Sequence, residues 1–482
     1  MGSPALLEAA SGAMALSGLA DGPPVVPPAA LATCVAHVTG SLSALAGERW
    51  AGGALDGAAL LGERAAIFGQ HRQGRTSPGG TCKLIRSASG WIAVNLPRAT
   101  DWECVPAWLE GEVAARDWGA VEAAVAERTA EELIERGRLL GLAVAKATAA
   151  GDDHAPERPA AAPVRVERIG VPCAARDARQ TPLVVDLSSL WAGPLASHLL
   201  ALAGARVVKV ESRRRPDGAR SGPAAFFDLL NAGKESVALD FSAHDDRVLL
   251  ERLIERADIV IEGSRPRALA QLGIDAAEAL GSRPGKVWVA ITGHGRSGAQ
   301  ADWIGFGDDA CAASGLAHAT GVAAGVASPL FCGDAVADPL AGLHAAWAAL
   351  TAWREGGGVL LDVSLVEVTR HVLAVWPMPG GARVRAAGRS AVDPSGRAWE
   401  VVVALPTAGP VGLQPESRSG SVGARARACG APRARALDRA GAAGTEVVCP
   451  VAEPRARAVT AFARPLGADT GGVLARLGIA AC

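Results

Sequence analysis

Asp338 is the carboxylate whose sequence setting most favours chemistry. It stands before Pro339 and a run, Leu340 to Trp353, that predicts a helix. Local sequence favours a structural role, because Asp at the N-cap followed by Pro at N1 is a common helix start. The same place suits a covalent nucleophile, since the helix dipole and free backbone N–H groups favour the anion. Asp334 and His344 are candidates for an acid–base pair nearby, although a lone His in an Ala-rich helix is usually only packed there.

Two glycine-containing segments raise the question of nucleotide binding. Gly293 to Gly298 (GHGRSG) fits the dinucleotide pattern GxGxxG and follows a predicted strand. That pattern belongs in the first βαβ unit and should open a helix directly, so a dinucleotide site is the less favoured interpretation here. Gly233 and Lys234 are followed by Glu235 rather than by Ser or Thr, which excludes a P-loop.

An alternation of apolar strands and amphipathic helices begins at Thr181 and positions these residues. It predicts an α/β fold: an open, mostly parallel sheet, which is a Rossmann-like large domain, together with a small α+β domain. The predicted strands are Leu183 to Leu187, Arg206 to Glu211, Ser236 to Phe241, Ala257 to Glu262 and Lys286 to Thr292. Ligands of such sheets bind beyond the carboxyl ends of the strands, so the loops after Leu187, Glu211, Glu262 and Thr292 are the expected binding region.

The chain divides by composition into four parts. Residues 1–150 form an N-terminal segment whose first 50 residues predict a loose lead-in or a few short helices. Within this segment, two short strands joined at Ser87 to Gly90, and a helix capped by Thr129 and Glu132, predict a small α+β unit. Residues 151–180 predict a linker, 181–376 the α/β domain, and 377–482 a degenerate C-terminal segment. An Arg-rich tract between Pro406 and Thr445 reads as a solvated linker more readily than as a phosphate site.

Composition excludes several classes of protein. The 482 residues carry a net charge of −1, so no overall field attracts nucleic acid or anionic lipid. The nine cysteines are scattered and form no CxxC pair, which argues against a zinc ribbon and suits a reducing compartment. The absence of Tyr excludes tyrosine chemistry. We expect a cytoplasmic protein with no membrane or nucleic-acid partner, no metal and no tightly bound cofactor.

Between Val184 and about Val368 the sequence contains a series of distinctive short runs. They include Val185-Asp186-Leu187 with Ala192-Gly193-Pro194, Gly204 to Glu211, Leu230 to Asp240, Ala257 to Glu262, Arg265-Pro266, Ser314-Gly315, Asp338 with Gly342, and Asp362 to Leu365. In order and spacing these runs resemble the family III CoA-transferases, the CaiB/BaiF group that also includes α-methylacyl-CoA racemases, and this makes the resemblance more specific than any single motif. One departure is the order of the parts, because the small-domain-like unit precedes the large domain.

The resemblance implies a site and an activity. Asp338 matches the family's catalytic aspartate, which carries CoA between two carboxylic acids through an anhydride and an aspartyl-CoA thioester. Coenzyme A and acyl-CoA are then substrates, a carboxylic acid is the acceptor, and a homodimer is the expected assembly. The residues that match CoA-contacting positions, or that are placed to hold its phosphates, are Leu190, Trp191, Arg213, Arg214, Gly263, Ser264 and Arg265.

Two alternatives stay open at this point. Racemases of the family use a His before the Ser-Gly step, and that position is Phe306 here, which carries no proton. Racemisation or another acyl-CoA isomerisation would therefore need His294 or Asp308 in its place. A non-catalytic CoA-binding protein would keep Leu190 to Pro194 and would not need Asp338.

Overall fold

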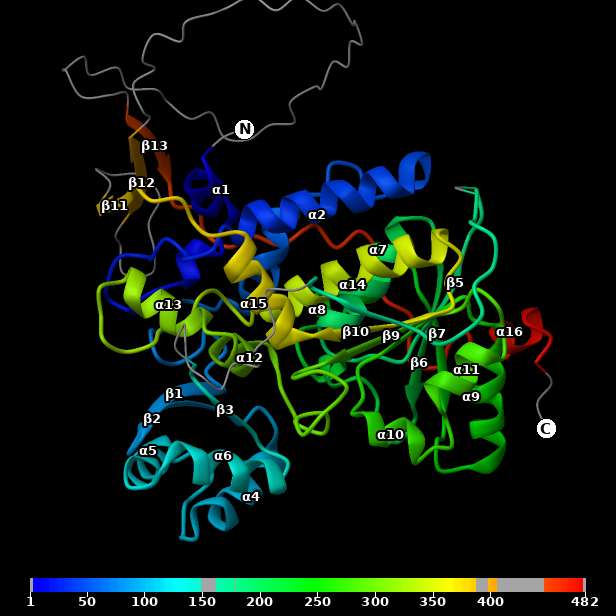
Figure 1. Ribbon diagram of the computed structural model, residues 1–482, viewed down its shortest axis with the longest axis horizontal. Helices are drawn as coiled ribbons and strands as arrows, with labels where there is room; N and C mark the ends of the chain where they lie inside the picture. Colours follow the sequence, from blue (N-terminus) through cyan, green and yellow to red (C-terminus); the bar gives the residue numbers. More distant parts are fainter. Residues whose placement is uncertain (1–2, 149–161, 178, 387–397, 405–445, 480–482) are drawn as a thin grey trace, which may run out of the picture.

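A seven-stranded sheet forms the centre of the molecule in the computed structural model, which describes residues 3–148, 162–177, 179–386, 398–404 and 446–479 (Figure 1). Its strand order is β4-β10-β9-β8-β5-β6-β7, and every neighbouring pair is parallel except the antiparallel pair of β4 and β10. The strands are β4 (Arg165–Arg168), β5 (Leu183–Asp186), β6 (Arg206–Ser212), β7 (Glu235–Leu239), β8 (Ile259–Glu262), β9 (Val287–Thr292) and β10 (Val359–Ser364). The predicted mostly parallel α/β sheet is confirmed.

Helices cover both faces of this sheet because successive strand residues are apolar on both sides. Val184 and Val207 face a core shared with one set of helices, whereas their neighbours Val185 and Val208 face the other core. The first set is α7 (Ala192–Leu202), α8 (Ala224–Asn231), α14 (Ala337–Arg354) and α15 (Leu365–Val375). The second set is α9 (His244–Arg256), α11 (Ala276–Gly281) and α16 (Thr470–Arg476).

The predicted small α+β unit lies beside the large sheet, next to α12 (Gly307–Ala313) (Figure 1). Its three antiparallel strands carry helices on one face, and their other face packs against Ala312, Ala317 and Phe331 of the large domain. Its elements are β1 (Cys82–Ser87), β2 (Gly90–Asn95), β3 (Ala143–Lys146), α4 (Ala99–Leu109), α5 (Trp118–Ala126) and α6 (Ala130–Leu139). Thr129 caps α6 by accepting from the Glu132 N–H, as the sequence predicted.

Of the two alternatives predicted for the first 50 residues, the loose lead-in is wrong and helices are confirmed, although one helix is longer than predicted. These residues contain α1 (Pro4–Ser11) and a 16-residue helix, α2 (Leu31–Ala46), which lies across α7 and α14 (Figure 1). Val35 and Leu42 of α2 are buried in the same core as α14. The bounds of this helix could not be predicted, because a segment with few charged residues lacks the polar face that makes a helical period visible in a sequence. Short 3₁₀ turns and α3 (Glu63–Phe68) follow it.

Strand β4 falls within the predicted linker 151–180, so part of that linker belongs to the sheet edge. A further antiparallel sheet, β11 (Ala382–Ala386), β12 (Trp399–Ala404) and β13 (Glu446–Pro450), packs on α1. The Arg-rich tract between Pro406 and Thr445 lies outside the described residues. The domain boundaries at 150, 180 and 376 remain predictions.

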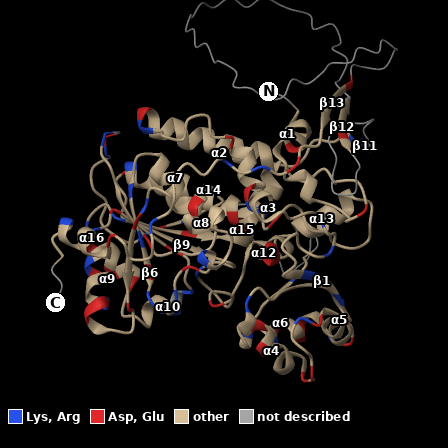
Figure 2. Cartoon of the chain, turned by 180° about the vertical axis from the view of Figure 1, so that it is seen from behind, with Lys and Arg blue, Asp and Glu red and all other residues tan. Residues whose placement is uncertain are grey.

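Two further α-helices belong to the described part of the large domain. They are α10 (Pro266–Ala270) after β8 and α13 (Leu316–Ala323) after α12. Figure 2 shows Lys and Arg interspersed with Asp and Glu over the chain, in keeping with its near-zero net charge.

Candidate active site

A buried ionic network holds the loop that follows the first parallel strand, β5. Asp186 at the end of β5 accepts from Ser188 and from the Ser197 hydroxyl, and its Oδ2 lies 3.2 Å from Lys234 Nζ. Burial would raise the pKa of Asp186, but the charges of Lys234 and Lys209 with these hydrogen bonds lower it to about 2. Lys234 is therefore a structural cation under the loop, which agrees with the exclusion of a P-loop.

A second buried pair shapes the same loop at Leu190. Lys209 Nζ donates to the Ser188 carbonyl and lies 2.9 Å from Asp217 Oδ2, while Asp217 Oδ1 accepts from the Leu190 N–H. Leu190 adopts a left-handed φ of 71° and is 42% exposed. The network thus turns the loop outward and offers Leu190 to solvent at the carboxyl edge of the sheet.

The structure brings several predicted CoA-contacting positions together at this edge. A Cβ built on Gly263, directly after β8, would lie 3.7 Å from the Ser188 side chain, so the loops after β5 and β8 are adjacent. Ser264 N–H donates to Glu262 at the end of the same strand. Trp191, in contrast, is only 3% exposed and packs edge-on against Phe226. Its ring is part of the wall, not an open contact surface.

The three arginines predicted to hold phosphates differ in their charged neighbours. Arg213 contacts Asp246 and Arg214 pairs with Asp240, both at the β7 side of the edge, and both guanidinium groups are largely exposed. Arg265 instead lies near Arg267, Arg98 and Arg215; partial burial, and then the charge of Arg267, lower its pKa, whereas the nearby carboxylate of Asp302 acts in the opposite direction. Like charges gathered in this way favour an anion between them. Arg265 is therefore the best placed of the three for a phosphate.

Asp338 lies in the first turn of α14 but does not cap it. The helix begins at Ala337, so Asp338 is its second residue and Pro339 its third, which corrects the predicted N-cap and N1 assignment. The chain reaches the helix through Gly333 and Ala335, which both have positive φ, and this tight turn takes the place of a capping side chain. The Asp338 side chain is left half-buried and free of a capping role.

Close helix packing places Asp338 beside the β5 loop. A Cβ on Gly342, one turn along α14, would lie 2.5 Å from the carbonyl of Ala192 at the start of α7. On the other side, a Cβ on Gly307 would collide with the Asp338 carboxylate and the Ala335 carbonyl. Two glycines therefore let the backbone of α7 and α12 approach the Asp338 turn.

Four acidic residues gather at this turn. Asp308 Oδ1 accepts from the Ala335 N–H, and Asp309 Oδ1 accepts from Asn95 of the small unit. Burial above all raises the pKa of Asp338 to about 7; Arg64 lowers it, and Asp308, Asp309 and Asp334 raise it further. Burial likewise raises the pKa of Asp308 to about 7 and that of Asp309 to about 6. The site holds carboxyl groups that titrate near neutral pH.

Sequence reasoning did not select Arg64, Gln70 and Asn95 for this site. Arg64 and a Gln70 amide turned to donate both hold Asp334, the remaining member of the acidic group. A signal for Arg64 existed, because Glu63-Arg64 is a charged pair inside an otherwise apolar run, and such charges are buried only when paired. Nothing in the local sequence of Asn95 indicated its partner.

The other sequence candidates lie outside this arrangement. Gly293 to Gly298 form a loop after β9 and open no helix, which contradicts a dinucleotide fingerprint. His294 is held against Arg138 and Trp303, and burial, with the Arg138 charge, lowers its pKa well below the usual range. His344 contacts the Leu340 carbonyl within α14, and burial lowers its pKa to about 4, so it is the packed histidine that the sequence favoured.

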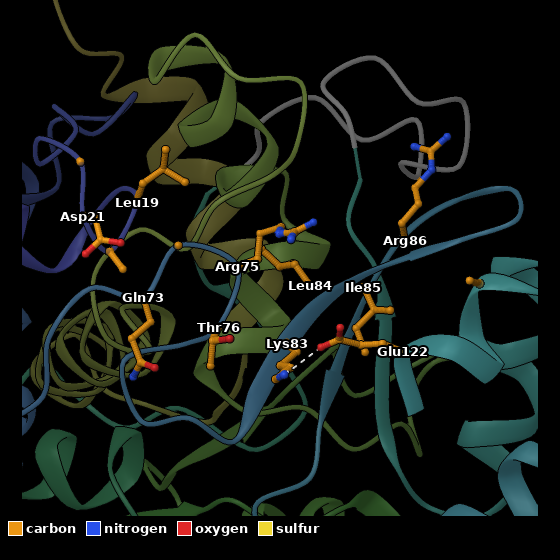
Figure 3. Close-up of a pocket in the computed structure, with 14 residues that line it drawn as sticks. Leu19, Asp21, Gln73, Arg75, Thr76, Lys83, Leu84, Ile85, Arg86 and Glu122 are labelled. Carbon is orange, nitrogen blue, oxygen red and sulfur yellow. Dashed lines mark hydrogen bonds and ion pairs between the residues drawn. The ribbon is translucent and has the colours of Figure 1, made fainter. Parts of the chain in front are cut away.

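A groove of about 870 Å³ lies elsewhere, between residues 19–22, residues 73–76 and β1. Figure 3 shows Lys83 on its wall pointing to Glu122, and the two charges lie 2.8 Å apart. None of the predicted site residues lines it. In the described part of the chain, no helix is long and apolar enough to cross a membrane, and no group of three or more potential ligand side chains is arranged to hold a metal.

Comparisons with known proteins match the large domain. Residues 182–400 match the model of CoA-transferase family III. The succinate–glutarate CoA-transferase of Agrobacterium fabrum is 35% identical over 217 residues, which cover 41% of this chain and 54% of the relative. The acetyl-CoA:oxalate CoA-transferase of Acetobacter aceti is 29% identical over 221 residues, 43% of this chain and 57% of the relative.

A solved CaiB/BaiF family protein from Brucella suis is 30% identical, covers 40% of this chain and 55% of its own, and superposes with a TM-score of 0.36. The chain thus spans little more than half the length of the curated relatives it matches. The matched region contains β5 to β10, the edge loops and Asp338. The resemblance seen in the sequence is confirmed over residues 182–400, which are similar to the family III CoA-transferases.

Proposed function

We propose that the protein is a CoA-transferase that moves CoA from an acyl-CoA to a carboxylic acid, with Asp338 as the nucleophile. The observation that carries the proposal is the half-buried Asp338 carboxylate, which lies beside the β5 loop inside the region matched to CoA-transferases. The Asp338 carboxylate does not cap α14. A carboxylate nucleophile divides the exchange into steps that each break one activated bond.

In the proposed reaction the Asp338 carboxylate attacks the thioester carbonyl of the donor and releases CoA thiolate. The resulting mixed anhydride is attacked by that thiolate at the Asp338 carbonyl, which frees the donor acid and leaves an aspartyl-CoA thioester. The acceptor carboxylate then attacks this thioester and releases the thiolate again. Attack of the thiolate on the acceptor acyl carbonyl gives the new acyl-CoA and restores Asp338, without net gain or loss of protons.

The edge loops supply the proposed CoA site. Exposed or half-exposed surface at adjacent strand ends comes from Leu190, Gly263 and Ser264. Arg265 and the arginines near it provide positive charge for phosphates. Arg213 and Arg214 extend this charge toward β7. A homodimer in the cytoplasm, as the resemblance implies, is part of the proposal.

The test is the mass of the intact protein after brief incubation with a panel of acyl-CoAs and quenching with hydroxylamine. A hydroxamate mapped to Asp338 would support the proposal and name a usable donor. We expect Asp338→Ala to lose transfer by at least about 10³-fold while it still binds CoA, because only the nucleophile is removed. Glu251→Ala, at an exposed carboxylate of α9, serves as the control and should transfer normally.

Retained transfer in Asp338→Ala would overturn the assignment of the nucleophile. Binding of CoA without an adduct from any acyl-CoA would instead favour the isomerase or non-catalytic alternatives.

A further inference from the structure

Arg64 joins the acidic group from outside the matched region. It lies on α3, more than a hundred residues before the large domain, and its guanidinium donates to both oxygens of Asp334, with a Nε–Oδ2 distance of 2.8 Å. The Asp334 side chain is fully buried, whereas that of Arg64 is 24% exposed. A two-point ion pair of this kind fixes geometry as well as charge.

The Arg64–Asp334 pair connects directly to the turn that carries Asp338. Asp334 precedes Ala335, a non-glycine residue with a left-handed φ of 44°. The Ala335 N–H donates to Asp308 over 3.0 Å, and its carbonyl accepts the Asp338 N–H over 2.9 Å. An unfavourable backbone conformation persists only where its surroundings hold it. Arg64, through Asp334, is one of the groups that hold it.

Arg64 also contacts the opposite wall of the site. Its guanidinium carbon lies 5.1 Å from the centre of the Trp191 ring, at the start of α7, where it makes a cation–π contact. Its helix is anchored in turn, since Arg457 from the C-terminal segment binds Glu63 and contacts His198 of α7. The Arg64 side chain thus links the end of the β5 loop, at Trp191, to the turn that carries Asp338.

Arg64 also contributes charge to the Asp338 site. The groups that face Asp338 are Asp308, Asp309 and the Cys311 thiol of α12, Asp334 of the turn and Arg64 of α3. Among the groups that act on the pKa of Asp338, Arg64 is the cation that lowers it. Burial would lower the pKa of Arg64 itself, but Asp334, Asp308 and Asp338 raise it overall, so it stays charged.

We propose that Arg64 is a positioning residue of the Asp338 site: it fixes Asp334 and the Ala335 turn, and it supplies the positive charge that faces the Asp338 carboxylate. The N-terminal segment is then a working part of the active site, although the family match begins only at residue 182. This inference rests on the proposed role of Asp338.

The test measures the protonation of Asp338 without any acyl-CoA. A small diazoacetamide esterifies a carboxylic acid only in its protonated form, and peptide mass spectrometry gives the labelled fraction of Asp338 between pH 5 and 10. In Arg64→Gln we expect the midpoint of labelling to rise by about one to three pH units, because the facing cation is gone. Arg64→Lys keeps the positive charge but cannot pair with both oxygens of Asp334 as Arg64 does. The rise of its labelling midpoint should therefore be smaller than that of Arg64→Gln.

Arg49→Gln is the matched control, since Arg49 joins the same N-terminal segment to Gln180 and Thr181 away from the acidic group. Its labelling midpoint should equal that of the unchanged protein. An unchanged midpoint in folded Arg64→Gln would overturn the inference.

If Arg64→Gln does not fold, Arg64→Met combined with Asp334→Asn removes the buried pair together and leaves no uncompensated charge. The midpoint should then be higher than in Asp334→Asn alone, and equal midpoints would overturn the inference.

Transfer assays separate this inference from the proposed function. Where the unchanged protein transfers CoA, Arg64→Gln should show at least about a fivefold loss of kcat/KM at pH 7, because a rise of one unit from a pKa of about 7 lowers the ionised fraction from about one half to about one eleventh. A protein that transfers no CoA would contradict the proposed function, while the labelling midpoints would still decide the role of Arg64.

Discussion

At the scale of single residues, Asp338 shows that a helix start and burial act in opposite directions on the same carboxylate. The first turn of α14 favours the anion through its dipole, as the sequence suggested. The structure adds burial and three neighbouring acids, which together raise the pKa of Asp338 to about 7. A less solvated anion is also a stronger nucleophile, because fewer hydrogen bonds must be broken when it attacks.

The raised pKa of Asp338 predicts how transfer depends on pH. In the proposed transfer Asp338 must be ionised, and its ionised fraction falls as the pH drops below about 7. We expect kcat/KM of the free enzyme to fall about tenfold per pH unit below pH 6 and to level off above pH 8. Initial rates from pH 5 to 9, with the acceptor acid kept fully ionised, would measure this limb. A flat profile down to pH 5 would contradict an Asp338 with this pKa.

At the scale of elements, the approach of α14 to α7 decides where Asp338 lies. The two helices touch at Gly342 and Ala192, where no side chain separates the backbones. Asp338 stands one turn before this contact and is therefore placed at the start of α7, which follows the β5 loop. This explains in physical terms why a glycine four residues after the aspartate belongs to the pattern seen in the sequence.

Gly342→Ala tests that helix contact. The added Cβ would meet the Ala192 carbonyl at 2.5 Å, and backbone cannot rotate away, so the helices must separate. We expect a loss of about 1–3 kcal/mol of unfolding free energy together with reduced transfer. Gly40→Ala is the matched control, because Gly40 lies exposed within α2 with open space around it, and it should stabilise by up to about 1 kcal/mol. Urea unfolding of both variants makes the comparison, and equal stability of the two would contradict the role of Gly342.

At the scale of the whole molecule, segments from both ends of the chain close over the large domain. Helix α2 covers α7 and α14, α16 packs beside β7, and the small unit docks next to α12 (Figure 1). The docking includes polar contacts that reach the acidic group. Asn95 donates to Asp309 over 2.9 Å, and Arg138 donates to the Ile304 carbonyl while its guanidinium stacks on Trp303. The small unit therefore helps to set the charges of the site.

Asn95→Leu tests this docking through its pH dependence. Burial, opposed mainly by the Asn95 hydrogen bond, raises the pKa of Asp309 to about 6. A native pKa above the unfolded value means that stability falls as the pH rises from about 4 to 6. Without the Asn95 amide this pKa rises further, so the loss of stability continues to higher pH. Unfolding free energies should differ little at pH 5 and by about 1–3 kcal/mol at pH 8. A difference that does not change with pH would contradict the Asn95–Asp309 contact.

The sequence by itself determined the parts that depend on local pattern. Apolar runs of strand length predicted β5 to β9, because buried parallel strands need no polar alternation. The hairpin of β1 and β2 and the cap of α6 followed from turn and capping residues. Order and spacing of the matched runs gave the resemblance and selected Asp338. The Ala-rich helix α2 and strand β4 were not predicted individually, since neither segment carries a contrast between polar and apolar faces.

Only the tertiary structure decided which groups surround Asp338. Arg64, Asn95 and Asp309 are separated by tens to hundreds of residues, and no local pattern records that they share one buried volume. Their pairing follows from the docking of α3 and the small unit on the large domain. The same docking sets how far Asp338 is desolvated, and therefore its pKa. A sequence can name a carboxylate, but the charge it carries at neutral pH depends on neighbours that only the folded chain brings within reach.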